Sequence, residues 1–161
     1  MKKILLLFML ISSVSFGQKK LDKLLNKFNK NNVPYISVNT LASTKAILLD
    51  AREKKEYKVS HLKNAIYVGY DHFKLNETLE KLPKDKSVQI VVYCSLGIRS
   101  EIIAHQLKTI GYTNVYNLYG GIFEWKNNNL TIVDTLGNIT EKVHVFNKNW
   151  SQWLKKGEKV Y

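Results

Sequence analysis

The chain has 161 residues, of which 45% are hydrophobic, so it is long enough for one domain with a sizeable core. Its formal net charge of +12 comes from lysines spread along the sequence, without an arginine cluster or interleaved aromatic residues, which argues against a nucleic-acid-binding protein. The four histidines are scattered and the cysteine is single, so no zinc-ligand spacing and no intramolecular disulfide is expected.

Residues 1–17 have the pattern of a secretory signal peptide. Lys2 and Lys3 precede an apolar run at 4–11, and small residues before Gln18 suit a signal peptidase. The apolar run is shorter than the roughly 20 residues that cross a bilayer. We therefore expect export to the periplasm or the medium, with no membrane attachment after cleavage. The alternative is that this segment is a hydrophobic strand or helix of the fold.

The following residues predict an α/β domain. A lysine-rich helical lead-in is expected at 18–33, and the domain at 34–130. Strands are predicted at 35–38, 46–49, 65–68, 88–93 and 114–118. Helical patterns lie between them at 54–59, 73–82 and 100–110, with a brief helical turn after Asn39 and a further helix after Gly121. Strands that alternate with helices indicate a mainly parallel sheet covered on both faces.

Residues 131–161 differ in character and form a C-terminal extension. Two alternating segments, 131–135 and 142–146, flank Gly137 and Asn138 and predict a hairpin. Trp150, Trp153 and Leu154 then predict a short amphipathic helix. We interpret the extension as a tail packed on the domain, with a lid or a partner surface as the alternative.

The chemistry is expected at Cys94. An apolar strand delivers this cysteine to a short loop with Gly97, and Arg99 stands where a helix begins. Backbone N–H groups of such a loop, the helix N-terminus and an arginine all favour a thiolate over a thiol. An inert core cysteine is the alternative for a lone cysteine at the end of a strand.

Residues 35–129 resemble a single-domain rhodanese, a sulfurtransferase of the rhodanese superfamily. The resemblance rests on several ordered motifs: Leu49-Asp50-Ala51-Arg52, Glu56-Tyr57 followed by His61-Leu62-Lys63-Asn64-Ala65, the segment Cys94-Ser95-Leu96-Gly97-Ile98-Arg99-Ser100, and Leu118-Tyr119-Gly120-Gly121 with Trp125. Ser60 stands where the family usually has glycine, and Lys63-Asn64 replaces its usual proline-glycine. Both departures lie outside the cysteine loop.

The resemblance implies a five-stranded parallel sheet flanked by helices and a thiosulfate:cyanide type of sulfur transfer. Cys94 would take the outer sulfur of a donor such as thiosulfate as a persulfide and pass it to cyanide or a thiol. The loop residues expected to hold the sulfur are Ser95, Leu96, Gly97, Ile98, Arg99 and Ser100. Asp50 and Arg52 would brace the loop, while we interpret His61 as a residue that fixes its own loop rather than as a catalytic one.

Two other functions stay open. Phosphatases and arsenate reductases of this fold hold five residues between cysteine and arginine, whereas four stand between Cys94 and Arg99, which favours a sulfur atom over a phosphate. A non-catalytic rhodanese-like module, or one that delivers sulfur within a complex, is the other alternative. The expected partners are a small-molecule sulfur donor, a thiol acceptor and, as a candidate, a thioredoxin-like reductant. We expect no metal or other cofactor, no nucleic-acid partner and a monomer.

Overall fold

The computed structural model describes residues 18–161, so the predicted signal peptide lies outside the described residues. The chain divides into two parts, one up to Asn31 and the other from Asn32 to Tyr161. In the first part the described residues form a helix at 18–28, in agreement with the predicted lead-in helix. Across residues 18–161, no helix has the length and apolar character needed to cross a bilayer.

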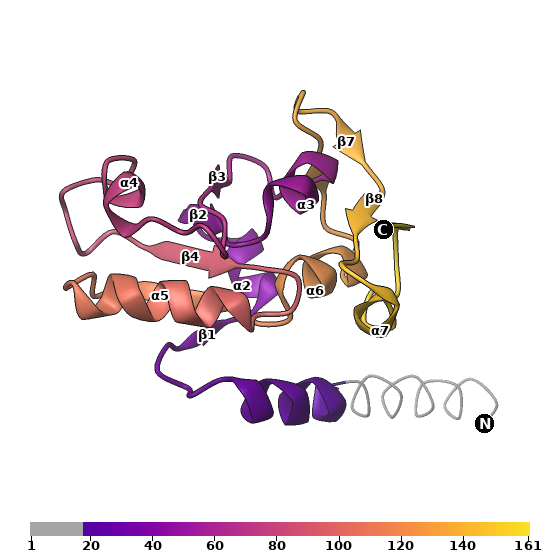
Figure 1. Cartoon of the computed structure of the whole chain (residues 1–161), viewed down its shortest axis with the longest axis horizontal. Helices are drawn as coiled ribbons and strands as arrows, with labels where there is room; N and C mark the ends of the chain where they lie inside the picture. Colours follow the sequence, from indigo (N-terminus) through magenta and orange to yellow (C-terminus); the bar gives the residue numbers. More distant parts are fainter. Residues whose placement is uncertain (1–17) are drawn as a thin grey trace. The chain divides into compact units, whose positions relative to one another are not determined.

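The second part is built on a five-stranded parallel sheet (Figure 1). From one edge to the other, its strands are β1 (Tyr35–Ile36), β5 (Val115–Leu118), β4 (Ile90–Tyr93), β2 (Ile47–Asp50) and β3 (Ile66–Tyr67). Every neighbouring pair is parallel. The predicted α/β class and parallel sheet are therefore confirmed, although each outer strand is shorter than its sequence pattern suggests.

Helices cover both faces of this sheet. They are α2 (Val38–Ala42), α3 (Lys54–Val59), α4 (Leu75–Leu79), α5 (Arg99–Thr109) and α6 (Gly121–Asn127). Ile90 and Val92 of β4 pack in one core with residues of α4 and α5. Leu48, which points to the opposite face, lines a cavity together with residues of α2 and α6. Burial on both faces explains why β4 is apolar throughout.

The C-terminal extension differs from the predicted hairpin in one strand. β6 (Ile132–Val133) pairs antiparallel with β7 (Ile139–Thr140), whereas β8 (Lys142–His144) pairs parallel with β9 (Glu158–Val160) at the C-terminus. The turn closes early because Asp134 and Asn138 exchange hydrogen bonds, so the partner of β6 begins directly after Asn138. The predicted helix is the single turn α7 (Lys148–Ser151), and Trp153 and Leu154 follow it.

Candidate active site

Cys94 stands at the carboxyl end of β4, directly before the loop that leads into α5. Gly97 takes a φ of +102°, a conformation open mainly to glycine, and its N–H lies 3.1 Å from the Cys94 sulfur. The Ser100 hydroxyl lies 3.5 Å from the same sulfur. The sequence therefore places a thiol where donors from the loop and the first turn of α5 converge on it.

The other side of the loop rests on α6. Ile122 N–H donates to the Cys94 carbonyl at 2.9 Å, and Phe123 N–H donates to the Ser95 carbonyl at 3.2 Å. A β-carbon at Gly121 would lie 2.2 Å from the Cys94 carbonyl oxygen, so only glycine permits this approach. With these carbonyls held by α6, the loop turns its N–H groups toward the sulfur.

Asn117 of β5 is a site residue that the sequence analysis missed. Its side chain is fully buried, donates to the Gly97 carbonyl at 2.8 Å and accepts from the Ser100 hydroxyl at 2.7 Å. Gly97 and Ser100 both hydrogen-bond to the Cys94 sulfur. Asn117 therefore fixes both of them. The only signal was a polar residue within an apolar strand, at the strand's carboxyl end.

The Arg99 guanidinium is hydrogen-bonded to neighbouring side chains of the protein. Its guanidinium makes a bidentate ion pair with Glu56, with distances of 2.7 and 2.8 Å, and donates to the Ser95 hydroxyl at 3.0 Å. Glu56 is fully buried and also accepts from the Glu53 N–H at the start of α3. Glu56 was part of the motif for the family resemblance, but the sequence analysis gave it no role.

Arg99 and its neighbours determine the protonation states of Cys94 and Glu56. Burial raises the pKa of the Cys94 thiol, but the Arg99 charge and hydrogen bonds from Ser100 and Gly97 outweigh it, so the pKa lies below its ordinary value. Burial likewise raises the pKa of Glu56, but Arg99 outweighs that effect and leaves a carboxylate. The site therefore favours a thiolate beside an ion pair.

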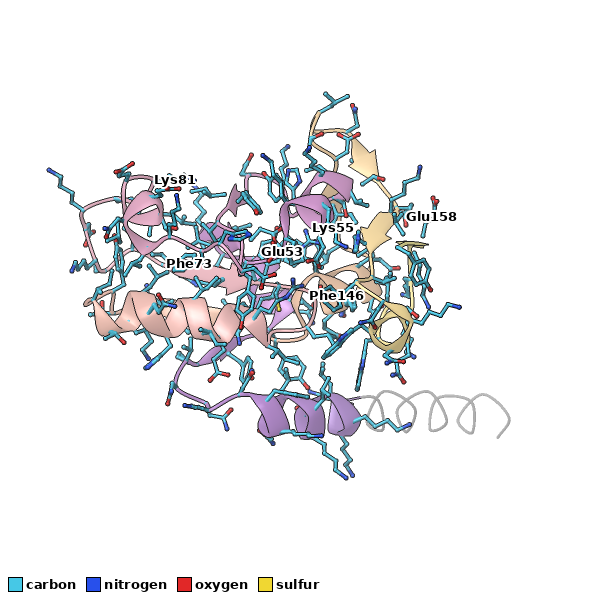
Figure 2. All side chains as sticks on the ribbon, viewed as in Figure 1. Glu53, Lys55, Phe73, Lys81, Phe146 and Glu158 are labelled. Atoms are coloured by element: carbon cyan, nitrogen blue, oxygen red, sulfur yellow. The ribbon has the colours of Figure 1, made fainter. Side chains whose placement is uncertain are left out.

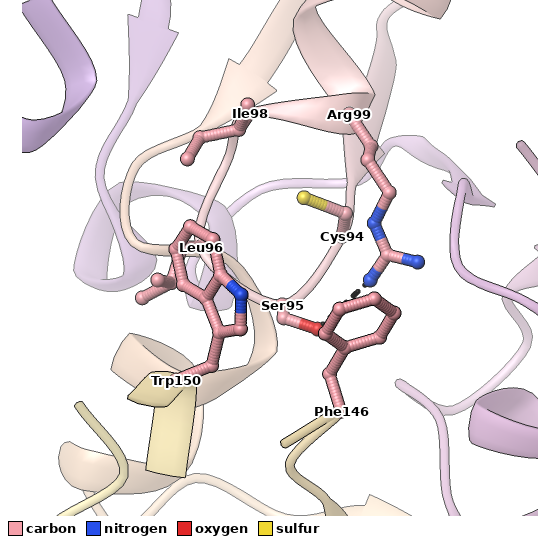
Figure 3. Close-up of a pocket in the computed structure, with 7 residues that line it drawn as sticks. All are labelled: Cys94, Ser95, Leu96, Ile98, Arg99, Phe146 and Trp150. Carbon is pink, nitrogen blue, oxygen red and sulfur yellow. Dashed lines mark hydrogen bonds between the residues drawn. The ribbon is translucent and has the colours of Figure 1, made fainter. Parts of the chain in front are cut away.

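A cavity of about 190 Å³ opens at Cys94 (Figure 3). Its lining residues are Cys94, Ser95, Leu96, Ile98, Arg99, Phe146 and Trp150. The first five belong to the predicted loop, so the structure gathers them around one space. Phe146, labelled in Figure 2, and Trp150 come from the C-terminal extension, Phe146 directly before the N-cap of α7 and Trp150 within α7. The sequence analysis did not place either aromatic residue at the site.

The three predicted supporting residues lie outside the cavity lining. Asp50 and Arg52 form a fully buried ion pair at 2.7 Å, and Arg52 also donates to the Ser60 carbonyl. The Arg52 guanidinium lies 5.7 Å from the ring of Tyr93, the residue before Cys94, so the pair supports the end of β4. Neither side chain has a direct hydrogen bond to the cysteine loop among the contacts described.

His61 stacks on Tyr57 with the ring centroids 3.9 Å apart, and its Nδ1 lies 3.1 Å from the Tyr57 carbonyl oxygen. Its backbone pairs with Val133 of β6. His61 thus lies in a structural contact between its own loop and the extension, away from the cavity lining. Among residues 18–161 no group of three or more histidine, cysteine or acidic side chains could hold a metal ion.

Comparison with known proteins identifies one family. A family model described as a rhodanese-like domain matches residues 20–128. A tRNA uridine(34) hydroxylase from Hamiltonella defensa is 36% identical over 117 residues, which are 71% of this chain and 31% of that protein. An adenylyltransferase and sulfurtransferase from Candida albicans is 34% identical over 113 residues, or 68% of this chain and 26% of that protein. The chain thus spans about a third or less of either relative.

Solved structures share the fold. A thiosulfate sulfurtransferase from Pseudomonas aeruginosa superimposes with a TM-score of 0.57 at 23% identity, covering 68% of this chain and 21% of that one. A polysulfide-sulfur transferase homodimer from Wolinella succinogenes gives a TM-score of 0.55 at 23% identity, covering 73% of this chain and 92% of that one. Both superpositions cover the greater part of this chain. At 23% identity they show that it shares the fold of these proteins.

Proposed function

Because the chain belongs to the family of rhodanese-like sulfurtransferases, we propose that it transfers a sulfane sulfur through a persulfide on Cys94. The observation that carries the proposal is the environment of the Cys94 sulfur. It faces a cavity, accepts a hydrogen bond from Gly97 N–H, and has a thiol pKa below the ordinary value. A thiolate held in this way is a nucleophile that can bind one further sulfur atom at the same position.

The reaction divides into two displacements at sulfur. The Cys94 thiolate attacks the outer sulfur of the donor, the donor's S–S bond breaks, and the sulfite of thiosulfate leaves with the bonding electron pair. The acceptor, cyanide or a thiolate, then attacks the outer sulfur of the persulfide and releases the Cys94 thiolate. Hydrogen bonds from the loop stabilise negative charge at the sulfur in both states.

Two features disfavour a phosphatase. Four residues separate Cys94 from Arg99, one fewer than that class uses. In addition, Glu56 occupies the Arg99 guanidinium with two hydrogen bonds, which removes the bidentate donor pair that a phosphate would need. The hydroxylase relative is about three times as long as the region matched here, so its named activity belongs to a much longer protein.

Mass spectrometry of the intact protein tests the proposal. Incubation with a sulfane-sulfur donor should add about 32 Da, and cyanide should remove the added mass and yield thiocyanate. Cys94→Ala should fold and show neither change. Ser87→Ala, a change in the exposed turn before β4, should behave as the unmodified protein. An unchanged mass with thiosulfate and with organic donors would refute the sulfurtransferase function and favour a binding module.

A further inference from the structure

Two aromatic side chains from the C-terminal extension complete the wall of the Cys94 cavity. Figure 3 shows Trp150 beside Leu96 and Ile98, and the Phe146 ring beside the Arg99 guanidinium. More than forty residues of sequence separate the loop from Phe146 and Trp150. The cavity is therefore assembled from two distant segments, and its side walls are mostly apolar.

The extension holds these aromatic residues in defined positions. Phe146 has a φ of +64°, a conformation rare for a residue with a bulky side chain, and its N–H donates to His144 Nδ1 at 3.0 Å. Asn147 caps α7 by accepting from the Trp150 N–H at 3.1 Å. Val145, between His144 and Phe146, is fully buried. These hydrogen bonds and the burial of Val145 thus fix the backbone next to Phe146 and Trp150.

The cavity offers little free positive charge. Of its seven lining residues, all within the described part of the chain, Arg99 is the charged one. Both terminal nitrogens of its guanidinium donate to Glu56, which compensates the charge, and the Phe146 ring covers it at 5.4 Å. A doubly charged anion such as thiosulfate would lose hydration here and gain no free cation in return.

The size of the cavity suits one small ring. An engineered apolar cavity of about 150 Å³ in another protein binds benzene, whereas this one measures about 190 Å³. An aromatic group placed between Trp150 and Phe146 would form the offset or edge-to-face contacts that such rings prefer. The terminal sulfur of a donor that carries such a group would then reach Cys94.

We propose that the cavity selects organic sulfane-sulfur donors of low charge, whose apolar group packs against Phe146 and Trp150, over inorganic thiosulfate. The inference rests on the proposed sulfur transfer and assigns its substrate class. For an organic thiosulfonate, R–SO₂–S⁻, the Cys94 thiolate attacks the terminal sulfur. The S–S bond breaks, the sulfinate R–SO₂⁻ leaves with the electron pair, and the persulfide forms on Cys94.

Three donors with the same reacting group test the selection: benzenethiosulfonate, methanethiosulfonate and thiosulfate. We expect kcat/KM for thiocyanate formation to fall in that order, after each value is divided by the donor's rate with a free thiol. Trp150→Ala and Phe146→Ala should each lower the ratio of kcat/KM for benzenethiosulfonate to kcat/KM for methanethiosulfonate by roughly 3- to 10-fold. This is the loss expected for one aromatic packing contact. Phe146→Leu, which keeps an apolar wall, should lower it less.

Trp153→Ala provides the matched control, because Trp153 belongs to the same segment but does not line the cavity. Its donor ratio should equal that of the unmodified protein. If thiosulfate is the best donor after normalisation, or if both cavity variants keep the original ratio, the proposed selection is wrong while sulfur transfer stands. If no donor loads Cys94, the proposed function itself fails.

Discussion

Replacing Glu56 by glutamine should cost the protein a large part of its stability. The change keeps the size of the side chain but removes a fully buried charge that receives two hydrogen bonds from Arg99 and one from the Ser95 hydroxyl. Breaking a buried ion pair by removing one partner costs about 3–5 kcal/mol. Since the Arg99 side chain is 18% exposed, we expect about 3 kcal/mol, the lower end of that range.

Urea unfolding at pH 7 measures this loss as a lower midpoint with an unchanged slope. With a slope of about 1.5 kcal/mol per molar, the midpoint should fall by roughly 2 M. Glu77→Gln is the matched control, because Glu77 pairs with Lys74 on the surface, where such pairs contribute little. Its midpoint should stay close to that of the unmodified protein.

The pH dependence gives a second test of the same pair. The pKa of Glu56 is lower in the folded protein than its ordinary value, so its contribution to stability is present above the ordinary carboxyl pKa. That contribution is lost as the pH falls through the folded-state pKa. The difference in unfolding free energy between the unmodified protein and Glu56→Gln should therefore narrow below about pH 4. A gap under about 1 kcal/mol at pH 7, or one that does not narrow in acid, would refute the reasoning.

Two further predictions concern the cysteine loop. Asn117→Leu should lower sulfur transfer by roughly tenfold or more with the fold retained, because it removes the hydrogen bonds that Asn117 makes with the Gly97 carbonyl and the Ser100 hydroxyl; thiocyanate formation and circular dichroism measure the two effects. The rate of Cys94 alkylation by iodoacetamide should rise with pH to a midpoint below the ordinary cysteine pKa of about 8.5, and Ser100→Ala should move that midpoint upward.

The first of these predictions has a matched control. Asn114→Leu changes an asparagine just before β5 that bonds the Ser87 carbonyl, so it should leave sulfur transfer intact. An Asn117→Leu protein with full activity would show that the loop holds its shape without this side chain. An alkylation midpoint at or above 8.5 in the unmodified protein would contradict the assigned role of Arg99 and the loop donors.

The local pattern around Cys94 predicted the centre of the fold well. A continuous apolar run, a short loop with glycine and a helix start are local features, and β4, the loop and α5 lie where these features predict them. The parallel pairing of the strands could also be predicted, because strands that alternate with helices along the sequence leave few other arrangements. The strand ends were less predictable, since tertiary contacts decide how far a ladder extends.

The remaining site residues depend on contacts between distant segments. Asn117 faces the loop because β5 pairs with β4 in a register that sets it beside Val92. Phe146 and Trp150 reach the cavity because β8 pairs with β9 rather than with β6, and the alternating pattern of residues 142–146 suits either partner. The local sequence determines neither the order of the strands nor which strands pair, so these roles could not be predicted from it.

The pairing of β8 with β9 ties both aromatic walls to the last residues of the chain. Phe146 and Trp150 lie within the segment that this short ladder closes, and Val145 N–H donates to the Val160 carbonyl next to them. A segment closed by so few hydrogen bonds opens as one cooperative unit. Hydrogen exchange in β9 and exposure of the sulfur should therefore report one shared equilibrium.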